Sequence, residues 1–457
     1  MKKISFISFI ILFCIFLLAC TAPHECHSDT WVLDAEFDCE EEWTYTKYCD
    51  VCGKIIDEKS EFVHHDYYTV TPEGSCTERQ KIMKYCHNCD YQKVEGYVEA
   101  LGHDYGEYVI TKEATVKNAG TKTRTCNRCG EVETMNYFYQ FSQIGFSTHG
   151  KLSVNGTHLV DQNGDIFQLM GLSTHGLQWY GNFVDYDVIK ACKETFNINV
   201  LRLSLYTAER GYCETSGDRK EALYQLVCKG IDIATSLDMY AIVDWHMLGE
   251  EDANDRNPLY YKEEAKEFFN RITLQYQDHD NILYEICNEP CGSTTWADIK
   301  EYANEVIPVI RNNKSDAIVL VGCPKWSSDL ASVQKSPLTG YENIMYTYHF
   351  YAADIKSPRG VKTAVSAGLP VFITEHGGMD ADGDGAINRD ACSEWYKFLN
   401  ANSISFVAWN LSNSNGSSAI MKHGAIDHTD FSDSNLKDWG IYYKNIIRAR
   451  LIELYGE

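Results

Sequence analysis

Eight apolar runs alternate with amphipathic stretches over about the last two thirds of this 457-residue chain, and this alternation is the strongest constraint on its fold. Parallel strands that are covered on both faces have such near-continuous apolar sequences. The gaps hold stretches long enough for crossover helices, such as KEEAKEFFNRITLQY and WADIKEYANEVIPVIRN. The predicted strands are FQLMGLST (167–174), NVLRLSLY (199–206), MYAIVDWH (239–246), ILYEICNE (282–289), AIVLVGC (317–323), IMYTYHFY (344–351), PVFITEHG (370–377) and SFVAWNLS (405–412).

The number of runs favours a single closed sheet. A doubly wound open sheet is the competing architecture, but eight strands over about 310 residues fit a barrel better. We therefore expect an α/β fold, a (β/α)8 TIM barrel over residues 148–457, preceded by small cysteine-rich repeats. A hairpin that turns at Asn155-Gly156 should open the barrel region, and residues 136–147 should form a linker.

Polar residues stand at or near the carboxyl ends of these runs, where (β/α)8 barrels place their active sites. Any one of them could instead pack in the core or cap a loop, so their convergence on one rim is what favours a binding or catalytic role. The residues at these ends are His175, Arg202, Tyr206, His246, Asn288, Glu289, His349, Tyr351, Glu375 and Trp409.

Glu289 and Glu375 are the candidate catalytic pair. Glu285 is also close to Glu289 in sequence, but four residues of strand separate the two by about 13 Å, too far for a paired attack on a sugar. Two carboxyls reaching inward across a barrel mouth can approach the roughly 5–5.5 Å that retaining glycosidases use. The alternative is a pair of rim glutamates held in salt bridges by Arg202 or by loop lysines.

Residues of about 146–457 resemble glycoside hydrolase family 5, in particular its bacterial endoglucanase (cellulase) subfamily. The matching stretches, in chain order, are GLSTHGLQWYG, NVLRLSLYT, IVDWHML, ILYEICNEP, YTYHFYA, FITEHG and AWNLS. The resemblance implies a retaining endo-β-1,4-glucanase that hydrolyses internal bonds of cellulose or a related β-glucan by double displacement. Glu289 would be the general acid/base and Glu375 the nucleophile.

The same resemblance implies roles for the residues around this pair. Asn288 should bond the sugar 2-hydroxyl, and Arg202 and Tyr351 should hold Glu375. Flat aromatic rings suit the apolar face of glucose, so Trp179 and Trp409 would be stacking platforms. The remaining predicted binding residues are His175, His246 and His349, which would line the cleavage subsite, and Tyr206.

Two departures from the family pattern put the distal sugar contacts in question. His376 follows the predicted nucleophile where family members often carry an aromatic residue, and SNSNG (412–416) replaces a loop that usually contains Lys and Glu. Mannan, xylan or mixed-linkage glucan are therefore alternative substrates. A non-catalytic, polysaccharide-binding surface lipoprotein is the alternative outside the enzymes.

The first residues predict export. Lys2 and Lys3 precede an apolar run that ends at Cys20, which is typical of a signal peptide over residues 1–20 rather than of a spanning helix. LLAC resembles a bacterial lipobox, in which the cysteine becomes lipidated, so we expect an extracellular protein that Cys20 anchors to the outer cell surface. Ordinary cleavage near Ala22 and free secretion is the alternative. No other segment approaches the roughly 18 apolar residues that span a bilayer.

Residues 24–135 are rich in cysteine and repeat a Cys, Cys-x2-Cys and His pattern. They look like the zinc-ribbon-like repeats of bacterial surface proteins, and three thiolates with an imidazole suit zinc. Exported cysteines often form disulfides instead, so both states remain open. A spacer role and a role in binding wall or substrate polymer also remain open. The predicted groups are Cys39, Cys49 and Cys52 with His64 or His65; Cys76, Cys86 and Cys89 with His103; and an incomplete third copy, Cys126 and Cys129, with Val116 in place of the leading cysteine.

Composition restricts the partners. A net charge of −24 and a pI near 5.0 disfavour nucleic acid, because neutralising phosphates requires clustered Lys and Arg. A neutral polysaccharide remains a suitable partner, its hydrolysis by two carboxylates requires no cofactor, and we expect a monomer. The stretch DADGDGAIN (380–388) resembles a calcium loop with Asp380, Asp382 and Asp384, although its twelfth position is Ala391 rather than Glu.

Overall fold

The computed structural model describes residues 24–34, 39–247, 256–314 and 316–456. These form two compact units, one of residues up to Glu107 together with Arg124–Val132, and one of Tyr108–Thr123 together with residues from Glu133 onward. The predicted signal peptide and the anchor residue Cys20 lie outside the described residues. Within the described part of the chain, no helix combines the length and apolar character that crossing a bilayer requires.

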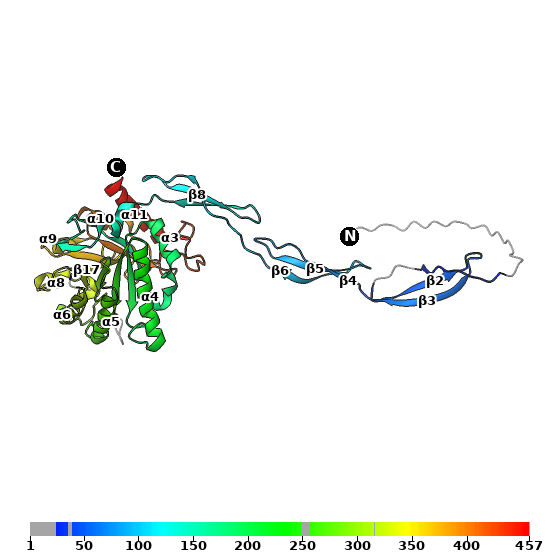
Figure 1. The fold of residues 1–457 in the computed structure, drawn as a ribbon, viewed down its shortest axis with the longest axis horizontal. Coiled ribbons are helices and arrows are strands. Elements are labelled where there is room, and N and C mark those ends of the chain that lie inside the picture. Colours follow the sequence, from blue (N-terminus) through cyan, green and yellow to red (C-terminus); the bar gives the residue numbers. More distant parts are fainter. Residues whose placement is uncertain (1–23, 35–38, 248–255, 315, 457) are drawn as a thin grey trace. The chain divides into compact units, whose positions relative to one another are not determined.

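The larger unit contains a closed barrel of eight parallel strands in sequential order, as the apolar runs predict. The last strand pairs with the first, which closes the sheet. Figure 1 shows the helices, such as α4 (Gly217–Ser236), α5 (Lys262–Gln275) and α6 (Trp296–Asn313), on the outside of this barrel. The (β/α)8 prediction is therefore confirmed. The strands are β12 (Met170–Thr174), β13 (Val200–Tyr206), β14 (Tyr240–His246), β15 (Ile282–Glu285), β16 (Val319–Val321), β17 (Ile344–Tyr351), β18 (Val371–Gly377) and β19 (Phe406–Leu411).

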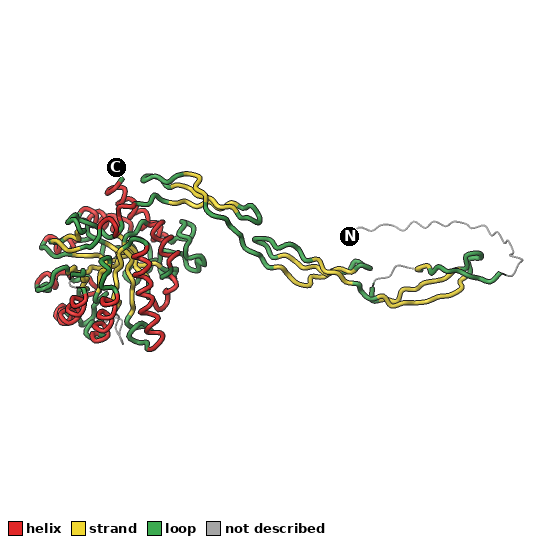
Figure 2. Tube along the Cα trace, in the orientation of Figure 1, coloured by secondary structure: helices red, strands yellow, loops and turns green. Residues whose placement is uncertain are grey.

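Helices follow the strands and surround the barrel, as the red and yellow segments of Figure 2 show. Their apolar stripes face the sheet, while their outer faces carry charged residues. The main helices are α3 (Tyr186–Phe196), α4 (Gly217–Ser236), α5 (Lys262–Gln275), α6 (Trp296–Asn313), α8 (Leu330–Lys335), α9 (Arg359–Ser366), α10 (Arg389–Ala401) and α11 (Asp438–Tyr455). Single turns are α1 (Phe146–His149), α2 (Leu177–Tyr180), α7 (Pro324–Ser327), η1 (Ser142–Ile144) and η2 (Gly181–Phe183).

The amino end of the barrel is closed by the predicted hairpin, β10 (Ser153–Asn155) and β11 (His158–Val160). Leu152 and Leu159 from this hairpin belong to the same buried cluster as inward-facing strand residues such as Tyr240. The barrel interior is thus packed at this end, which leaves the carboxyl end of the strands for a ligand site.

The N-terminal unit has little apolar core. Among the described residues 24–135, every buried apolar side chain is a cysteine. Such small repeats require a staple, because they bury too little apolar surface to fold alone. Two three-stranded sheets lie in this unit: β1 (Val32–Leu33), β2 (Glu41–Tyr48) and β3 (Ile55–Val63); β4 (Tyr67–Val70), β5 (Gln80–Cys86) and β6 (Gln92–Val98). A third sheet, β7 (Val109–Lys112), β8 (Gly120–Thr125) and β9 (Val132–Tyr137), belongs mostly to the larger unit.

The predicted grouping of the cysteines is wrong. Cys39 lies just before β2 and Cys49 just after it, so an eight-residue strand holds them about 27 Å apart. Each leading cysteine therefore joins the Cys-x2-Cys turn of the next repeat, and the third group is complete. The observed groups are His24, Cys26, Cys49 and Cys52; Cys39, His65, Cys86 and Cys89; and Cys76, His103, Cys126 and Cys129.

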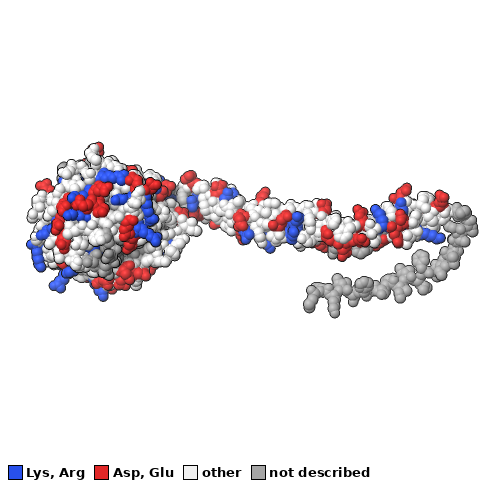
Figure 3. Space-filling view, turned by 90° about the horizontal axis from the view of Figure 1, so that it is seen from below, with Lys and Arg blue, Asp and Glu red and all other residues white. Residues whose placement is uncertain are grey.

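Acidic and basic side chains are interspersed on the face of each unit that Figure 3 shows, as far as its residues are described. No continuous basic patch covers this face. The distribution agrees with the net charge of −24.

Candidate active site

The predicted site residues gather at the carboxyl end of the barrel. Arg202 is fully buried within β13, whereas Trp179, on α2 after the first strand, is 44% exposed. Strand β15 is shorter than predicted and ends at Glu285, because its pairing with β16 ends at Leu320. The other predicted residues are placed as follows: His175 after β12, Tyr206 on β13, His246 on β14, Asn288 and Glu289 after β15, His349 and Tyr351 on β17, Glu375 on β18 and Trp409 on β19.

The two candidate catalytic carboxylates lie close together. One oxygen of Glu289, one oxygen of Glu375 and one ring nitrogen of His349 all lie within 4.8 Å of one another. This limit fits the roughly 5–5.5 Å between carboxyls in retaining glycosidases and is shorter than the roughly 6.5–9.5 Å of inverting ones. Glu285 is not part of the pair, since its oxygens accept hydrogen bonds from Arg202 at 2.7 Å and from Thr374 at 2.7 Å.

Both oxygens of Glu375 are held in place. The Arg202 Nη1 donates to Glu375 Oε2 at 3.1 Å, and the Tyr351 hydroxyl donates to Oε1 at 3.0 Å. Arg202 and Tyr351 thus both contact Glu375. Arg202 also donates through Nε to Glu285 and through Nη2 to Asn288 Oδ1, both at 2.7 Å. One buried guanidinium therefore orients the candidate nucleophile and its neighbours.

Glu289 has two cationic neighbours. His349 Nδ1 lies 2.9 Å from Glu289 Oε1, and Arg256 Nη1 donates to Oε2 at 3.0 Å. The other ring nitrogen of His349 lies 2.9 Å from the hydroxyl of Thr374, which itself donates to Glu285. Burial opposes a charge on His349, but Glu285 and Glu289 raise its pKa to about 9. Its cationic form donates through both ring nitrogens.

The surroundings shift the pKa values of the two carboxyls in opposite directions. Burial opposes the charge on Glu289, but the hydrogen bond from His349 and the charges of His349 and Arg256 outweigh it, so its pKa lies below the usual value. Burial and then the charge of Glu289 raise the pKa of Glu375. Two carboxyls this close titrate as one coupled pair. In the resting site, Glu289 is the more acidic member.

A polar chain fixes the state of His246. Asn288 Oδ1 accepts from Arg202, so the Asn288 amide nitrogen faces His246 Nε2 at 3.1 Å. His246 Nε2 is then an acceptor, and the proton on Nδ1 bonds Asp244 Oδ2 at 2.7 Å. Burial, and after it the charge of Arg202, holds the pKa of His246 well below its usual value. The imidazole is therefore neutral.

The aromatic residues form one packed group. Tyr206 stacks on His246 with ring centroids 4.1 Å apart, and Trp409 lies against the same imidazole at 5.4 Å. Trp179 meets Tyr206 edge to face at 5.4 Å, and His175 lies 5.2 Å from Trp409. Trp409 is only 8% exposed, so of the two predicted platforms Trp179 presents the open ring.

Three residues near the site are absent from the sequence prediction. Asp244 stands two residues before His246 on one strand, so alternation along the strand was a usable signal. Arg256 comes from a loop and Trp326 from the single turn α7, where no periodicity indicates direction. Trp326 is 44% exposed, and its backbone N–H bonds the carbonyl of Pro290 at 3.0 Å, next to Glu289.

The departures noted in the sequence lie beside the catalytic pair rather than in it. His376 is buried and bonds the carbonyl of Val407 at 2.7 Å and the hydroxyl of Tyr396 at 2.8 Å, so its ring faces away from the barrel mouth. The loop 412–416 lacks its own lysine, but Lys437 donates to the carbonyls of its residues Ser414, Asn415 and Gly416.

The aspartates of residues 380–388, which resemble a calcium loop in sequence, accept hydrogen bonds from protein groups. Asp384 Oδ1 accepts from the backbone and the hydroxyl of Ser417 at 3.1 and 2.6 Å, and Asp382 Oδ1 accepts from the backbone of Asp384. In the described residues, no three carboxylates of 380–388 converge as metal ligands. Asp382 thus stabilises the loop's own turn, whereas Asp384 joins the loop to Ser417.

A carboxylate pair at this spacing, at the carboxyl end of a (β/α)8 barrel, defines a glycoside hydrolase of the retaining type. Comparison with known proteins agrees. Residues 160–415 match the family described as Cellulase (glycosyl hydrolase family 5). The chain therefore belongs to glycosyl hydrolase family 5.

Similar proteins are endoglucanases and cellulases. The chain is 46% identical over 294 residues to Endoglucanase A of Butyrivibrio fibrisolvens, which covers 64% of this chain and 67% of the relative. It is 42% identical over 312 residues to Endoglucanase of Clostridium saccharobutylicum, and this match covers 68% of this chain and 67% of the relative. Among solved structures, Cellulase Cel5C_n superposes with a TM-score of 0.63 at 35% identity, covering 68% of this chain and 95% of that one. The catalytic domain of Thermobifida fusca endoglucanase Cel5A, solved as a variant in complex with cellotetraose, superposes with a TM-score of 0.61 at 33% sequence identity. The match covers 66% of this chain and 99% of that one.

Proposed function

We propose that this chain is a retaining endo-β-1,4-glucanase that cuts internal bonds of cellulose or a related β-glucan. The observation that carries the proposal is the pair of Glu289 and Glu375, with oxygens within 4.8 Å of each other on a family 5 barrel. The relatives named endoglucanase and the cellotetraose complex of one structural neighbour support the substrate class.

The reaction proceeds in two displacements. In the first, a Glu375 oxygen attacks the anomeric carbon while the bond to the leaving sugar breaks, and that sugar's oxygen takes the proton of Glu289. In the second, Glu289 removes a proton from water, the water oxygen attacks the anomeric carbon, and the bond to Glu375 breaks. Each displacement inverts the configuration, so the product retains it. Carboxylates and water suffice, and no cofactor takes part.

Glu289 must carry a proton when the glucan is bound, although its resting neighbours favour its anion. Arg256 and His349 both contact this carboxylate, and positive charges stabilise its ionised form. The leaving oxygen must replace one of these contacts. We infer that Arg256 moves, because its side chain is 16% exposed whereas that of His349 is 2% exposed.

The exposed aromatic residues are suited to a polymer. Trp179, near β12, and Trp326, near the Glu289 segment, are each 44% exposed and come from different sides of the barrel mouth. Flat rings pack against the apolar faces of sugars. We propose that they bind glucose units on either side of the cleaved bond, which is what internal cleavage requires.

The substrate is tested by incubating the full chain with carboxymethyl cellulose, mixed-linkage glucan, mannan and xylan in parallel. The proposal predicts a rapid fall in viscosity of the β-glucans, with few new reducing ends, and release of cello-oligosaccharides. Cleavage of mannan or xylan alone would keep the chemistry and change the substrate. No cleavage by a folded barrel would support a non-catalytic polysaccharide-binding protein instead.

We also propose that the protein is exported and anchored to the outer cell surface through Cys20. The basic start, the apolar run and the LLAC stretch support this. Metabolic labelling with a fatty acid should mark the wild type and a Cys14→Ser variant but not Cys20→Ser. Release of all three proteins into the medium without label would favour free secretion.

The N-terminal unit is proposed to be a spacer that keeps the catalytic barrel away from the membrane. With no apolar side chains other than cysteines buried in residues 24–135 as described, its stability must come from the cysteine and histidine groups. If it binds polymer instead, deleting residues 24–135 would reduce adsorption to insoluble polysaccharide. The catalytic unit is expected to act as a monomer, which light scattering of the purified chain tests.

A further inference from the structure

Three clusters in the N-terminal unit each bring three cysteine sulfurs and one histidine nitrogen within 4.8 Å of one another. All three have the same organisation: a Cys-x2-Cys turn, a histidine and a third cysteine. In the second cluster, Cys39 comes from the preceding repeat, His65 from the segment between two sheets, and the turn from Cys86 and Cys89. The third cluster repeats this arrangement one repeat further on.

The distances within the clusters fit a tetrahedron around zinc. With Zn–S bonds of about 2.3 Å and Zn–N bonds of about 2.05 Å, the edges are about 3.8 Å between sulfurs and about 3.6 Å between sulfur and nitrogen. The Sγ–Sγ distance is 3.7 Å for Cys26 and Cys52, and 3.5 Å for Cys39 and Cys86. It is 3.8 Å for Cys76 and Cys126.

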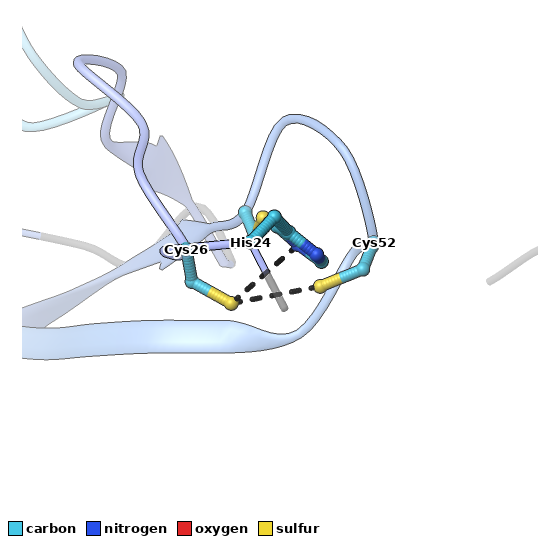
Figure 4. Close-up of side chains that lie close together, drawn as sticks. His24, Cys26 and Cys52 are labelled. Carbon is cyan, nitrogen blue, oxygen red and sulfur yellow. Dashed lines mark hydrogen bonds between the residues drawn. The ribbon is translucent and has the colours of Figure 1, made fainter. Parts of the chain in front are cut away.

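The histidine distances agree as well. His24 Nε2 lies 3.6 Å from Cys49 Sγ and 3.9 Å from Cys26 Sγ, and Figure 4 shows its ring directed at the sulfurs. His65 Nδ1 lies 3.4 Å from Cys89 Sγ. In the third cluster, His103 Nδ1 lies 3.3 Å from Cys129 Sγ. One imidazole nitrogen per cluster thus faces the sulfurs.

Backbone groups are already directed at the sulfurs. The N–H of Asn88 donates to Cys86 Sγ at 3.3 Å, and the N–H of Asp104 donates to Cys126 Sγ at 3.3 Å. Such N–H groups stabilise thiolates, the form that binds metal. A disulfide requires about 2.05 Å between sulfurs and would leave one unpaired cysteine in every three-cysteine cluster. Soft sulfur ligands with one imidazole in a tetrahedron favour zinc.

We propose that the N-terminal unit binds three zinc ions, each held by ligands from two successive segments of the repeat array. The ions then join the repeats to one another, rather than stabilising each repeat separately. In the first cluster, Cys26 takes the place that Cys39 and Cys76 have in the other two. Zinc binding displaces the thiol protons, so loading should release protons and weaken at acidic pH.

The first experiment measures bound zinc per full chain by mass spectrometry of the metal, after purification with zinc and removal of loose ions. The shared-ligand arrangement predicts three zinc ions, whereas ligands taken from within single repeats would give two complete sites. Two double variants separate these arrangements. Cys39→Ser with Cys86→Ser removes ligands of one cluster and should leave two ions, while Cys39→Ser with Cys49→Ser affects two clusters and should leave one.

Neighbouring histidines provide a matched control. His65 is a proposed ligand, whereas His64 bonds Glu40 and belongs to no cluster. In competition with a chromophoric chelator, His65→Ala should release one zinc at least about tenfold more readily, and His64→Ala should behave as the wild type. Turnover of soluble β-glucan by the same preparations shows whether each variant's barrel has folded.

Two further results would overturn the proposal. One is a chain that holds less than one zinc and whose non-reduced peptides contain Cys–Cys links. The other is less bound zinc in the variant with Cys39→Ser and Cys86→Ser than in the variant with Cys39→Ser and Cys49→Ser. A zinc chelator should also accelerate tryptic cleavage within residues 39–129 without changing turnover of soluble β-glucan, and cleavage that is unaffected by chelation would contradict a stabilising role.

Discussion

Replacing Arg202 with methionine should destabilise the barrel strongly, and most at neutral pH. The guanidinium is fully buried and contacts Asp244, Glu285 and Glu375 at 3.0, 2.7 and 3.1 Å. Methionine fills similar space but leaves these carboxylates without their shared cation. Removing one partner of a buried ion pair costs about 3–5 kcal/mol. We therefore expect at least this loss, or a fall of about 6–20 °C in the unfolding midpoint.

The loss of stability in Arg202→Met should depend on pH in a definite direction. Burial opposes the charge on Glu285, but Arg202 outweighs it and lowers its pKa in the folded protein. This contribution to stability is present above the pKa of the unfolded state and is lost as pH falls through the folded pKa. In Arg202→Met the largest influence opposing burial is lost and His349 is left to favour the Glu285 anion, so protonation of Glu285 relieves the variant. The difference in unfolding free energy should therefore be larger at pH 7–8 than at pH 4–5.

The assay is urea unfolding followed by tryptophan fluorescence, at several pH values. Arg271→Met is the matched control, because Arg271 donates twice to Glu221 at 2.7 Å, but the two side chains are 43% and 47% exposed. An exposed pair contributes at most about 1 kcal/mol. If Arg202→Met lowers the free energy of unfolding by less than about 1 kcal/mol, or by an amount that does not change with pH, the reasoning is refuted.

Three further predictions concern turnover. Glu289→Gln and Glu375→Gln should each reduce turnover of β-glucan at least about 10³-fold with unchanged thermal unfolding, and substantial activity in either would overturn the assignment. Trp179→Ala and Trp326→Ala should each raise KM for cello-oligosaccharides about 2–10-fold with little change in kcat, and a fall in kcat alone would argue against stacking. Arg256→Gln removes a positive charge that lowers the pKa of Glu289, so the alkaline limb of kcat/KM should move to higher pH. Arg256→Lys should leave the limb near its original position, and equal profiles for both variants would contradict the charge effect.

The barrel and most of its site are predictable from the sequence because strands buried on both faces leave a clear apolar signature. Glu289 and Glu375 stand at the ends of two such runs, and barrel closure brings their oxygens within 4.8 Å. The extent of β15 was not predictable in the same way. The apolar run continues through Cys287, but strand pairing with β16 stops at Glu285.

The residues that modulate the site depend on loop geometry, which local sequence does not encode. Arg256 reaches Glu289 across 33 residues of sequence, and no pattern marks it. The grouping of the cysteines was likewise not predictable from local sequence. Repeat spacing suggests that Cys39 serves its own repeat, but the extended strand β2 carries Cys49 away from it. The length of the intervening strand, rather than proximity in sequence, decides the grouping.

The most direct test of the proposed mechanism is the anomeric configuration of the first product. Proton NMR of the wild-type chain acting on cellotetraose should show the β-anomer of the new reducing end first, with the α-anomer increasing later by mutarotation. This result is expected if Glu375 forms a covalent intermediate at the observed spacing of the pair. Initial appearance of the α-anomer would show single displacement by water and contradict the account.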